Sequence, residues 1–133
     1  MISDGIDIHP SKNNAGVQAY IGDAIYELYI RRYTIQSGVS RTDAMNRFKV
    51  RYVKASAQAK VIKTILENLT EEEQGVVRRA RNKKVSTKPK NADLMDYKWA
   101  TAFEALLGSL FIAGNETRIE EIIEQAIEII ERK

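Results

Sequence analysis

Two carboxylates stand inside apolar stretches of this sequence. Asp23 lies within AYIGDAIYELYI, residues 19–30, and Glu104 is the only charged residue in WATAFEALLGSLFIA, residues 99–113. An ionised carboxylate in a dry site is costly unless it is paired or binds a metal. Oxygen ligands without histidine or cysteine favour Mg²⁺ or Mn²⁺ over zinc. The pattern therefore predicts a divalent cation bound between Asp23 and Glu104.

A second interpretation competes with the metal site. A single acid in an apolar helix is more often partly exposed, or paired with a basic side chain, than bound to a metal. Glu27, one helical turn after Asp23, has both interpretations: it is either a further ligand or the partner of Arg31 at i+4. For Glu27 the salt bridge is the favoured prediction.

The composition excludes several other chemistries. The chain has no cysteine, and its one histidine, His9, lies in a polar N-terminal segment. Disulfides, thiolate metal sites and cysteine nucleophiles are excluded, and a histidine-based triad or zinc site is disfavoured. There is no glycine-rich phosphate loop. Because cysteine is absent and no apolar stretch is long enough to span a bilayer, we expect a cytoplasmic protein.

Positive charge is concentrated in one part of the chain. Residues 41–90 hold 14 Lys and Arg against 5 Asp and Glu, whereas the rest of the chain holds 7 against 13. This asymmetry predicts one basic face, whose natural partner is a polyanion. A second interpretation is a solvated charged surface. The residues predicted to contact this polyanion lie in and before the one long loop: Arg78, Arg79, Arg81, Lys83, Lys84, Lys88, Lys90 and Asn91. A second candidate strip holds Arg47, Lys49, Arg51 and Lys54.

The elements that position these residues are predicted to be helices. A chain of 133 residues is expected to form one all-α domain, 1–133, around one core. Apolar residues at helical spacing predict helices over 14–37, 40–69 with a candidate break at 52–54, 70–82, 94–113 and from 117 onward. Gly38 is a predicted helix stop. Ser40 with Asp43, and Thr70 with Glu73, are predicted capping boxes, and 83–93 is the loop.

Two glycines lie inside predicted helices, next to or near the two carboxylates. Gly22 precedes Asp23, and Gly108 follows Glu104 by four residues. A glycine inside a helix costs about 1 kcal/mol relative to alanine, so a packing reason is expected. Close approach of the two helices is the simplest reason, and it would bring the two carboxylates near each other.

The same two segments resemble the signature helices of the ribonuclease III family. The residues that carry the resemblance are Tyr20-Ile21-Gly22-Asp23-Ala24 and Phe103-Glu104-Ala105-Leu106-Leu107-Gly108, about 80 residues apart. Arg81-Asn82-Lys83 and Pro89-Lys90-Asn91 resemble the Mini-ribonuclease III branch in particular. So does the length, because this branch carries no appended double-stranded-RNA-binding domain.

The resemblance implies the all-α endonuclease-domain fold of ribonuclease III and a Mg²⁺-dependent endoribonuclease, with Mn²⁺ as a possible substitute. Asp23 and Glu104 would be the catalytic and metal-binding residues, and the products would carry 5′-phosphates. The implied partners are double-stranded RNA, in particular precursor large-subunit (23S-type) ribosomal RNA, and a second copy of the chain. The expected dimer surface is apolar and lies around Tyr20, Ala24 and Phe103.

The chain departs from the long enzymes of the family at three positions. These enzymes carry glutamates seven and four residues before the signature aspartate, where this chain has Gly16 and Ala19. They carry an aspartate three residues before the second signature glutamate, where this chain has Thr101. The missing carboxylates leave one alternative open, an RNA-binding or ribosome-associated module that keeps the fold without catalysis. A second alternative is a helical interaction protein whose basic loop binds an acidic protein.

Overall fold

The computed structural model describes residues 5–7, 9, 13–85, 90 and 93–132, and it confirms the all-α prediction. The elements are α1 (Ala15–Gln36), α2 (Thr42–Val53), α3 (Ala55–Ile65), a 3₁₀ turn η3 (Leu66–Asn68), α4 (Glu71–Asn82), α5 (Leu94–Ile112) and α6 (Glu116–Glu131). No strand occurs among these residues. No helix of the described residues has the length and apolar character that crossing a membrane requires.

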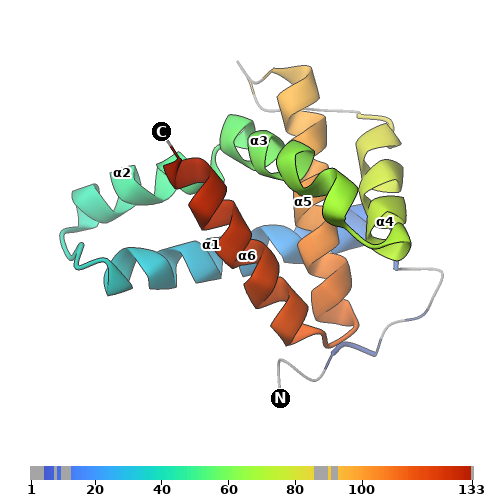
Figure 1. The fold of residues 1–133 in the computed structure, drawn as a ribbon, viewed down its shortest axis with the longest axis horizontal. Helices are drawn as coiled ribbons and strands as arrows, with labels where there is room; N and C mark the ends of the chain where they lie inside the picture. The colour runs from blue at the N-terminus through green and yellow to red at the C-terminus, as the bar shows by residue number, and fades with distance from the viewer. Residues whose placement is uncertain (1–4, 8, 10–12, 86–89, 91–92, 133) are drawn as a thin grey trace.

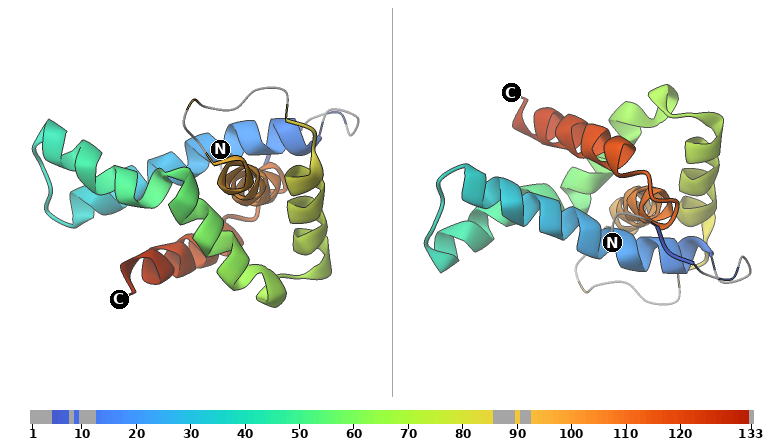
Figure 2. Two further views of the ribbon diagram at one scale, coloured as in Figure 1. Left: turned by 90° about the horizontal axis from the view of Figure 1, so that it is seen from above. Right: turned by 90° about the horizontal axis from the view of Figure 1, so that it is seen from below.

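Helix α5 is the central element of the fold (Figure 1). Seen nearly end-on, it has α1 passing on one side and α4 on another, whereas α2 extends away from it (Figure 2). It packs most extensively on α1, and then on α3 and α4. This placement explains its sequence, because a helix covered on nearly all sides is apolar all round. Fully buried residues such as Phe103, Leu106 and Leu107 put it in the hydrophobic core.

Helices α1 and α5 cross with their backbones in contact at the two glycines. A Cβ built on Gly22 would overlap the main-chain carbonyl oxygen of Glu104, and one built on Gly108 would overlap the carbonyl oxygen of Gln18. No side chain larger than hydrogen fits at either position. The predicted close approach is therefore confirmed, and it carries Asp23 on α1 toward Glu104 on α5.

The predicted helix ends are mostly right. Gly38 has φ +87° just after α1, which is the left-handed conformation that glycine adopts at a helix stop. Lys54, extended with ψ 150°, separates α2 from α3 at the predicted break. The capping box of Thr70 and Glu73 is present. The one predicted at Ser40 is wrong: α2 begins one residue later, with Arg41 as N-cap and no side-chain cap.

Helix α6 is a packing helix, as its pattern of isoleucines and glutamates predicted. Its buried face is formed by Ile119, Ile122, Ile123, Ala126 and Ile129. Two ionic groups fix its ends. Arg118 forks onto the Glu73 carboxylate through Nε and Nη2, at 2.8 and 2.9 Å, and Glu131 accepts a 2.7 Å hydrogen bond from the hydroxyl of Tyr52.

Candidate active site and basic surface

Asp23 and Glu104 lie side by side at the crossing of α1 and α5, but in different environments. The carbonyl of Glu104 faces Gly22, the residue before Asp23, so the two side chains leave the crossing as neighbours. The Glu104 side chain is half-buried, whereas Asp23 is exposed. The expectation of a dry site was therefore wrong for Asp23. Helix α1 turns its Gly22 side to α5 and the adjacent Asp23 side to solvent.

The surroundings of Glu104 disfavour its ionised form. Burial of the carboxyl, and then the nearby negative charge of Asp23, raise the pKa of Glu104 to about 8. A hydrogen bond from Gln58 acts in the opposite direction and lowers this pKa. Two carboxylates held as neighbours repel each other when both are ionised. A cation between them would remove this cost.

The donor set fits Mg²⁺ better than a metal that needs a complete protein cage. Among the described residues, no three His, Cys, Asp or Glu side chains form a group that could hold a metal ion. Mg²⁺ usually keeps several waters and is held in proteins by one or two carboxylates together with substrate phosphates. Asp23 and Glu104 can supply such a pair of carboxylates.

Gln58 is a residue of this site that the sequence reasoning missed. It lies on α3 and is 3% exposed. Its amide nitrogen donates to the Val53 carbonyl at 2.8 Å and to the Glu104 carboxylate at 3.4 Å. Its oxygen, Oε1, is buried without a hydrogen-bond partner among the described residues. A lone glutamine on the apolar face of α3, between Ala57 and Ala59, was the available signal.

We predict that Gln58→Leu lowers the rate of RNA cleavage about fivefold while leaving stability nearly unchanged. The substitution removes one hydrogen bond to Glu104, worth about 1 kcal/mol. It also removes a buried oxygen without a partner, which offsets the bond lost at Val53. Initial cleavage rates and urea unfolding of the same preparation check both parts. A cleavage rate equal to that of wild type would contradict a positioning role for Gln58.

Glu27 does not join the carboxylate pair. Its carboxylate forms an ion pair with the Arg31 guanidinium at 2.6 Å, as the favoured prediction stated, and the Lys49 ammonium on α2 lies 3.4 Å from the same carboxylate. Both contacts lower the pKa of Glu27, against the effect of burial. The Thr101 hydroxyl donates to the Tyr97 carbonyl at 2.9 Å.

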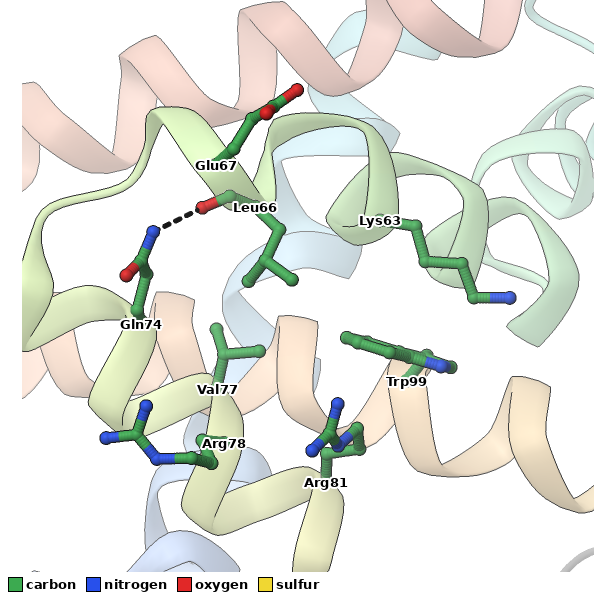
Figure 3. A pocket seen from close by; sticks show the side chains of 8 residues that line it. All are labelled: Lys63, Leu66, Glu67, Gln74, Val77, Arg78, Arg81 and Trp99. Carbon is green, nitrogen blue, oxygen red and sulfur yellow. Dashed lines mark hydrogen bonds between the residues drawn. The ribbon is translucent and has the colours of Figure 1, made fainter.

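The structure places four of the predicted RNA contacts in two pockets. Arg78 and Arg81 line a pocket of about 480 Å³ between α3, α4 and α5 (Figure 3). The Arg81 guanidinium lies 5.0 Å from the ring centre of Trp99, and the Lys63 ammonium lies 5.8 Å from it. Trp99 therefore holds two cations in place on this side of the molecule.

Lys83 and Lys84 line a different pocket, of about 250 Å³, between α1, α4 and α5. We call it the α1–α4–α5 pocket. Arg79 and Lys90 are exposed, and Arg79 lies back along α4 over Gly75. Lys88 and Asn91 lie outside the described residues.

Three residues of the second basic strip make side-chain contacts within the fold. Arg47 pairs with Asp43 at 3.4 Å, and Lys49 pairs with Glu27. Arg51 lies over the rings of Phe48 and Tyr52, at 5.7 and 5.4 Å from their centres. These contacts make the strip a weaker candidate for RNA than the segment at 78–90.

Comparison with known proteins places the whole arrangement in one family. The model of the "Ribonuclease III domain" matches residues 17–115. A "Mini-ribonuclease 3" of Brevibacillus brevis is 45% identical, with 92% of this chain and 91% of that protein covered. One of Symbiobacterium thermophilum is 44% identical, with 86% and 88% covered. The crystal structure of a Fusobacterium nucleatum protein superposes with a TM-score of 0.79 at 36% identity, covering 86% of this chain and 92% of that one. The chain therefore belongs to the Mini-ribonuclease III branch of the ribonuclease III family.

Proposed function

We propose that this chain is a Mg²⁺-dependent endoribonuclease that hydrolyses phosphodiester bonds in double-stranded RNA, with residues 1–133 acting as one catalytic domain. Asp23 and Glu104 are the proposed catalytic and metal-binding residues. The observation that carries the proposal is their juxtaposition at the glycine crossing of α1 and α5. The relatives named Mini-ribonuclease 3, which align with most of the chain, support the reaction class.

The two carboxylates have different tasks in this mechanism. A bound Mg²⁺ would supply Lewis-acid stabilisation of the charge that develops on the scissile phosphate. Exposed Asp23 can accept a hydrogen bond from the attacking water and orient it. Glu104, which Gln58 holds from the α3 side, is the fixed member of the pair. Attack on phosphorus breaks the bond to the 3′-oxygen, so the products carry a 5′-phosphate and a 3′-hydroxyl.

The proposed RNA surface is the basic end of α4 and the segment after it. A-form RNA is recognised largely through phosphates and 2′-hydroxyls across its minor groove, which suits lysine and arginine. Binding is expected to weaken steeply as salt rises. The proposed contacts are Arg78, Arg79, Arg81, Lys83, Lys84 and Lys90, together with Lys88 and Asn91 outside the described residues.

A homodimer is the proposed active form, since the family's catalytic domain commonly dimerises. Tyr20 is 84% exposed and Leu28 63% exposed, and Ala24 lies between them on the same face of α1. This apolar stripe is the proposed interface. Phe103, which was expected to share it, is fully buried in the core, because α5 is covered by its neighbours.

The proposed biological substrate is precursor large-subunit (23S-type) ribosomal RNA, whose ends the enzyme would mature in the cytoplasm.

The test compares a long duplex RNA with its separated strands, each incubated with Mg²⁺ or with EDTA. The proposal expects cutting of the duplex alone, in Mg²⁺ alone, and products that carry 5′-phosphates. Tight, salt-sensitive binding without cutting under any divalent metal would instead favour a non-catalytic RNA-binding module. Retention on duplex RNA that disappears when an acidic protein competes would favour a protein-binding role.

A further inference from the structure

The α1–α4–α5 pocket lies one helical turn from the carboxylate pair. Ala19 in its lining is four residues before Asp23 on α1, and Thr101 is three residues before Glu104 on α5. We propose that this pocket is a subsite for one backbone phosphate of the RNA strand being cut, a neighbour of the scissile phosphate. The inference rests on the proposed nuclease function and adds a defined anion site to it.

The charge of the pocket suits an anion. Lys83, Lys84 and Lys98 line it from α5 and from the segment at the end of α4, and none of its lining residues is an Asp or Glu. None of the ion pairs found within the described residues involves these three lysines. Three lysines that line one small pocket, with no carboxylate in its lining, make the pocket favourable for an anion.

The shape of the pocket leaves room for a phosphate beside these lysines. Its α1 and α4 walls are formed by small residues, Gly16, Ala19 and Ala80. The Lys83 ammonium lies only 2.5 Å from the position that a Cβ on Gly16 would occupy, so the lysine reaches the backbone of α1. This is the first turn of a 22-residue helix without an acidic residue there, and the helix dipole adds to the positive potential.

The position of the pocket matches the path of a strand through the site. Four residues of helix span roughly 6 Å, and successive phosphates of one strand lie only a few ångströms apart along a duplex axis. A strand with its scissile phosphate at Asp23 and Glu104 therefore has another phosphate within reach of the pocket.

The three positions at which this chain departs from the long enzymes lie in this pocket. Gly16, Ala19 and Thr101 stand where those enzymes carry carboxylates, and all three line this pocket. In this chain lysines line the same region, and no carboxylate does.

The experiment is a scan of a short duplex RNA in which each phosphate of one strand is replaced, one at a time, by an uncharged methylphosphonate. Binding is measured in Mg²⁺ with the Asp23→Asn variant, so that the duplex stays intact. We expect one or two positions beside the cleaved bond to weaken binding about five- to tenfold. When Lys83→Met and Lys98→Met are added to the Asp23→Asn variant, the same phosphate replacements should no longer weaken binding.

Lys60→Met is the matched control. It removes one exposed lysine from α3, two residues after Gln58 and thus on the opposite side of that helix, and its scan should equal that of the parent. If the double lysine variant does not show cooperative thermal unfolding, the scan is done instead with Lys98→Met alone, which leaves the loop sequence unchanged. The subsite would be overturned if phosphate replacement weakened binding equally with and without the lysine substitutions. It would also be overturned if no replacement weakened binding by the Asp23→Asn variant.

Failure of the subsite and failure of the nuclease proposal are separable. Cutting of the unmodified duplex by the wild-type protein reports on the nuclease, and it does not depend on the scan. The scan reads binding alone. If the wild type did not cut, coupling between a lysine and one phosphate would still support a backbone-phosphate site in this pocket, while the nuclease proposal would fail.

Discussion

A single methyl group added at Gly108 is expected to destabilise the protein by about 4 kcal/mol or more, enough to unfold many domains of this size. The new Cβ would overlap the carbonyl oxygen of Gln18, and Gly22→Ala would meet the carbonyl oxygen of Glu104 in the same way. Because the obstacle is backbone, relief requires that α1 and α5 move apart along the largest helix contact of the fold. Urea unfolding followed by circular dichroism measures the effect.

Gly75→Ala is the control for this prediction. Gly75 is buried within α4, but the nearest atom to its added Cβ is the end of the Arg79 side chain, at 3.2 Å, which can move. Helix propensity then dominates, and the variant should gain about 0.5–1 kcal/mol. Gly108→Ala or Gly22→Ala melting together with the wild type would show that the two helices do not meet through their backbones.

Glu104→Gln is expected to abolish cleavage and yet stabilise the metal-free protein at alkaline pH. The loss of a carboxylate from the pair should reduce the cleavage rate roughly 10³-fold, as when a group that stabilises transition-state charge is removed. The gain in stability follows from the pKa of Glu104, which is raised in the folded state to about 8 from an ordinary 4.5.

The sign of the pH effect follows from proton linkage. A group whose pKa is raised by folding stabilises the protein while it is protonated, below its unfolded pKa. That contribution is lost as the pH rises through the folded pKa. Wild type and Glu104→Gln should therefore be similar near pH 4 to 5, and the variant should become more stable up to about pH 8 and level off above it. One pKa unit corresponds to roughly 1.4 kcal/mol, and since the side chain is not fully enclosed, we expect a plateau on the order of 2 kcal/mol.

Urea unfolding in EDTA at several pH values between 4 and 9 measures this difference. Glu124→Gln, at an exposed position on α6, is the control and should follow the wild type throughout. A constant offset between Glu104→Gln and wild type at every pH would contradict the raised pKa. Mg²⁺ should reduce the difference, because a cation at the pair favours the ionised wild-type carboxyl.

The sequence was most informative where a residue type has few physical explanations. A glycine inside an apolar helix has to be explained by packing, and Gly22 and Gly108 did predict the backbone contact of α1 and α5. Thr70 and Glu73 have the spacing of a capping box and form one. Ser40 and Asp43 have the same spacing and do not, because Arg41 takes the N-cap position, and local spacing alone cannot show which residue starts the helix.

The candidate site was less predictable, since it depends on how three helices are rotated about their axes. Apolar neighbours in the sequence suggested that Asp23 is buried, yet they face other directions around α1 and leave it exposed. Gln58 lies 46 residues before Glu104 in the chain, and no periodicity on α3 shows that its amide meets that carboxylate. The basic run at 78–90 was visible as charge. The sequence could not show that some of these residues line a pocket at Trp99 and others a pocket at Gly16, because this depends on where α3 and α1 lie relative to α4.

The central claim is that Asp23 and Glu104 hold the Mg²⁺ with which this chain cuts double-stranded RNA. The most direct test is the rate of cleavage of one end-labelled duplex as Mg²⁺ is titrated, for wild type and Asp23→Asn, with Asp43→Asn on exposed α2 as control. The account predicts Mg²⁺-dependent cutting by wild type and by Asp43→Asn, and a loss of roughly 10³-fold or more in Asp23→Asn, whose exposed position leaves the fold intact. Cutting by Asp23→Asn at the wild-type rate, or cutting by wild type that persists in EDTA, would contradict it.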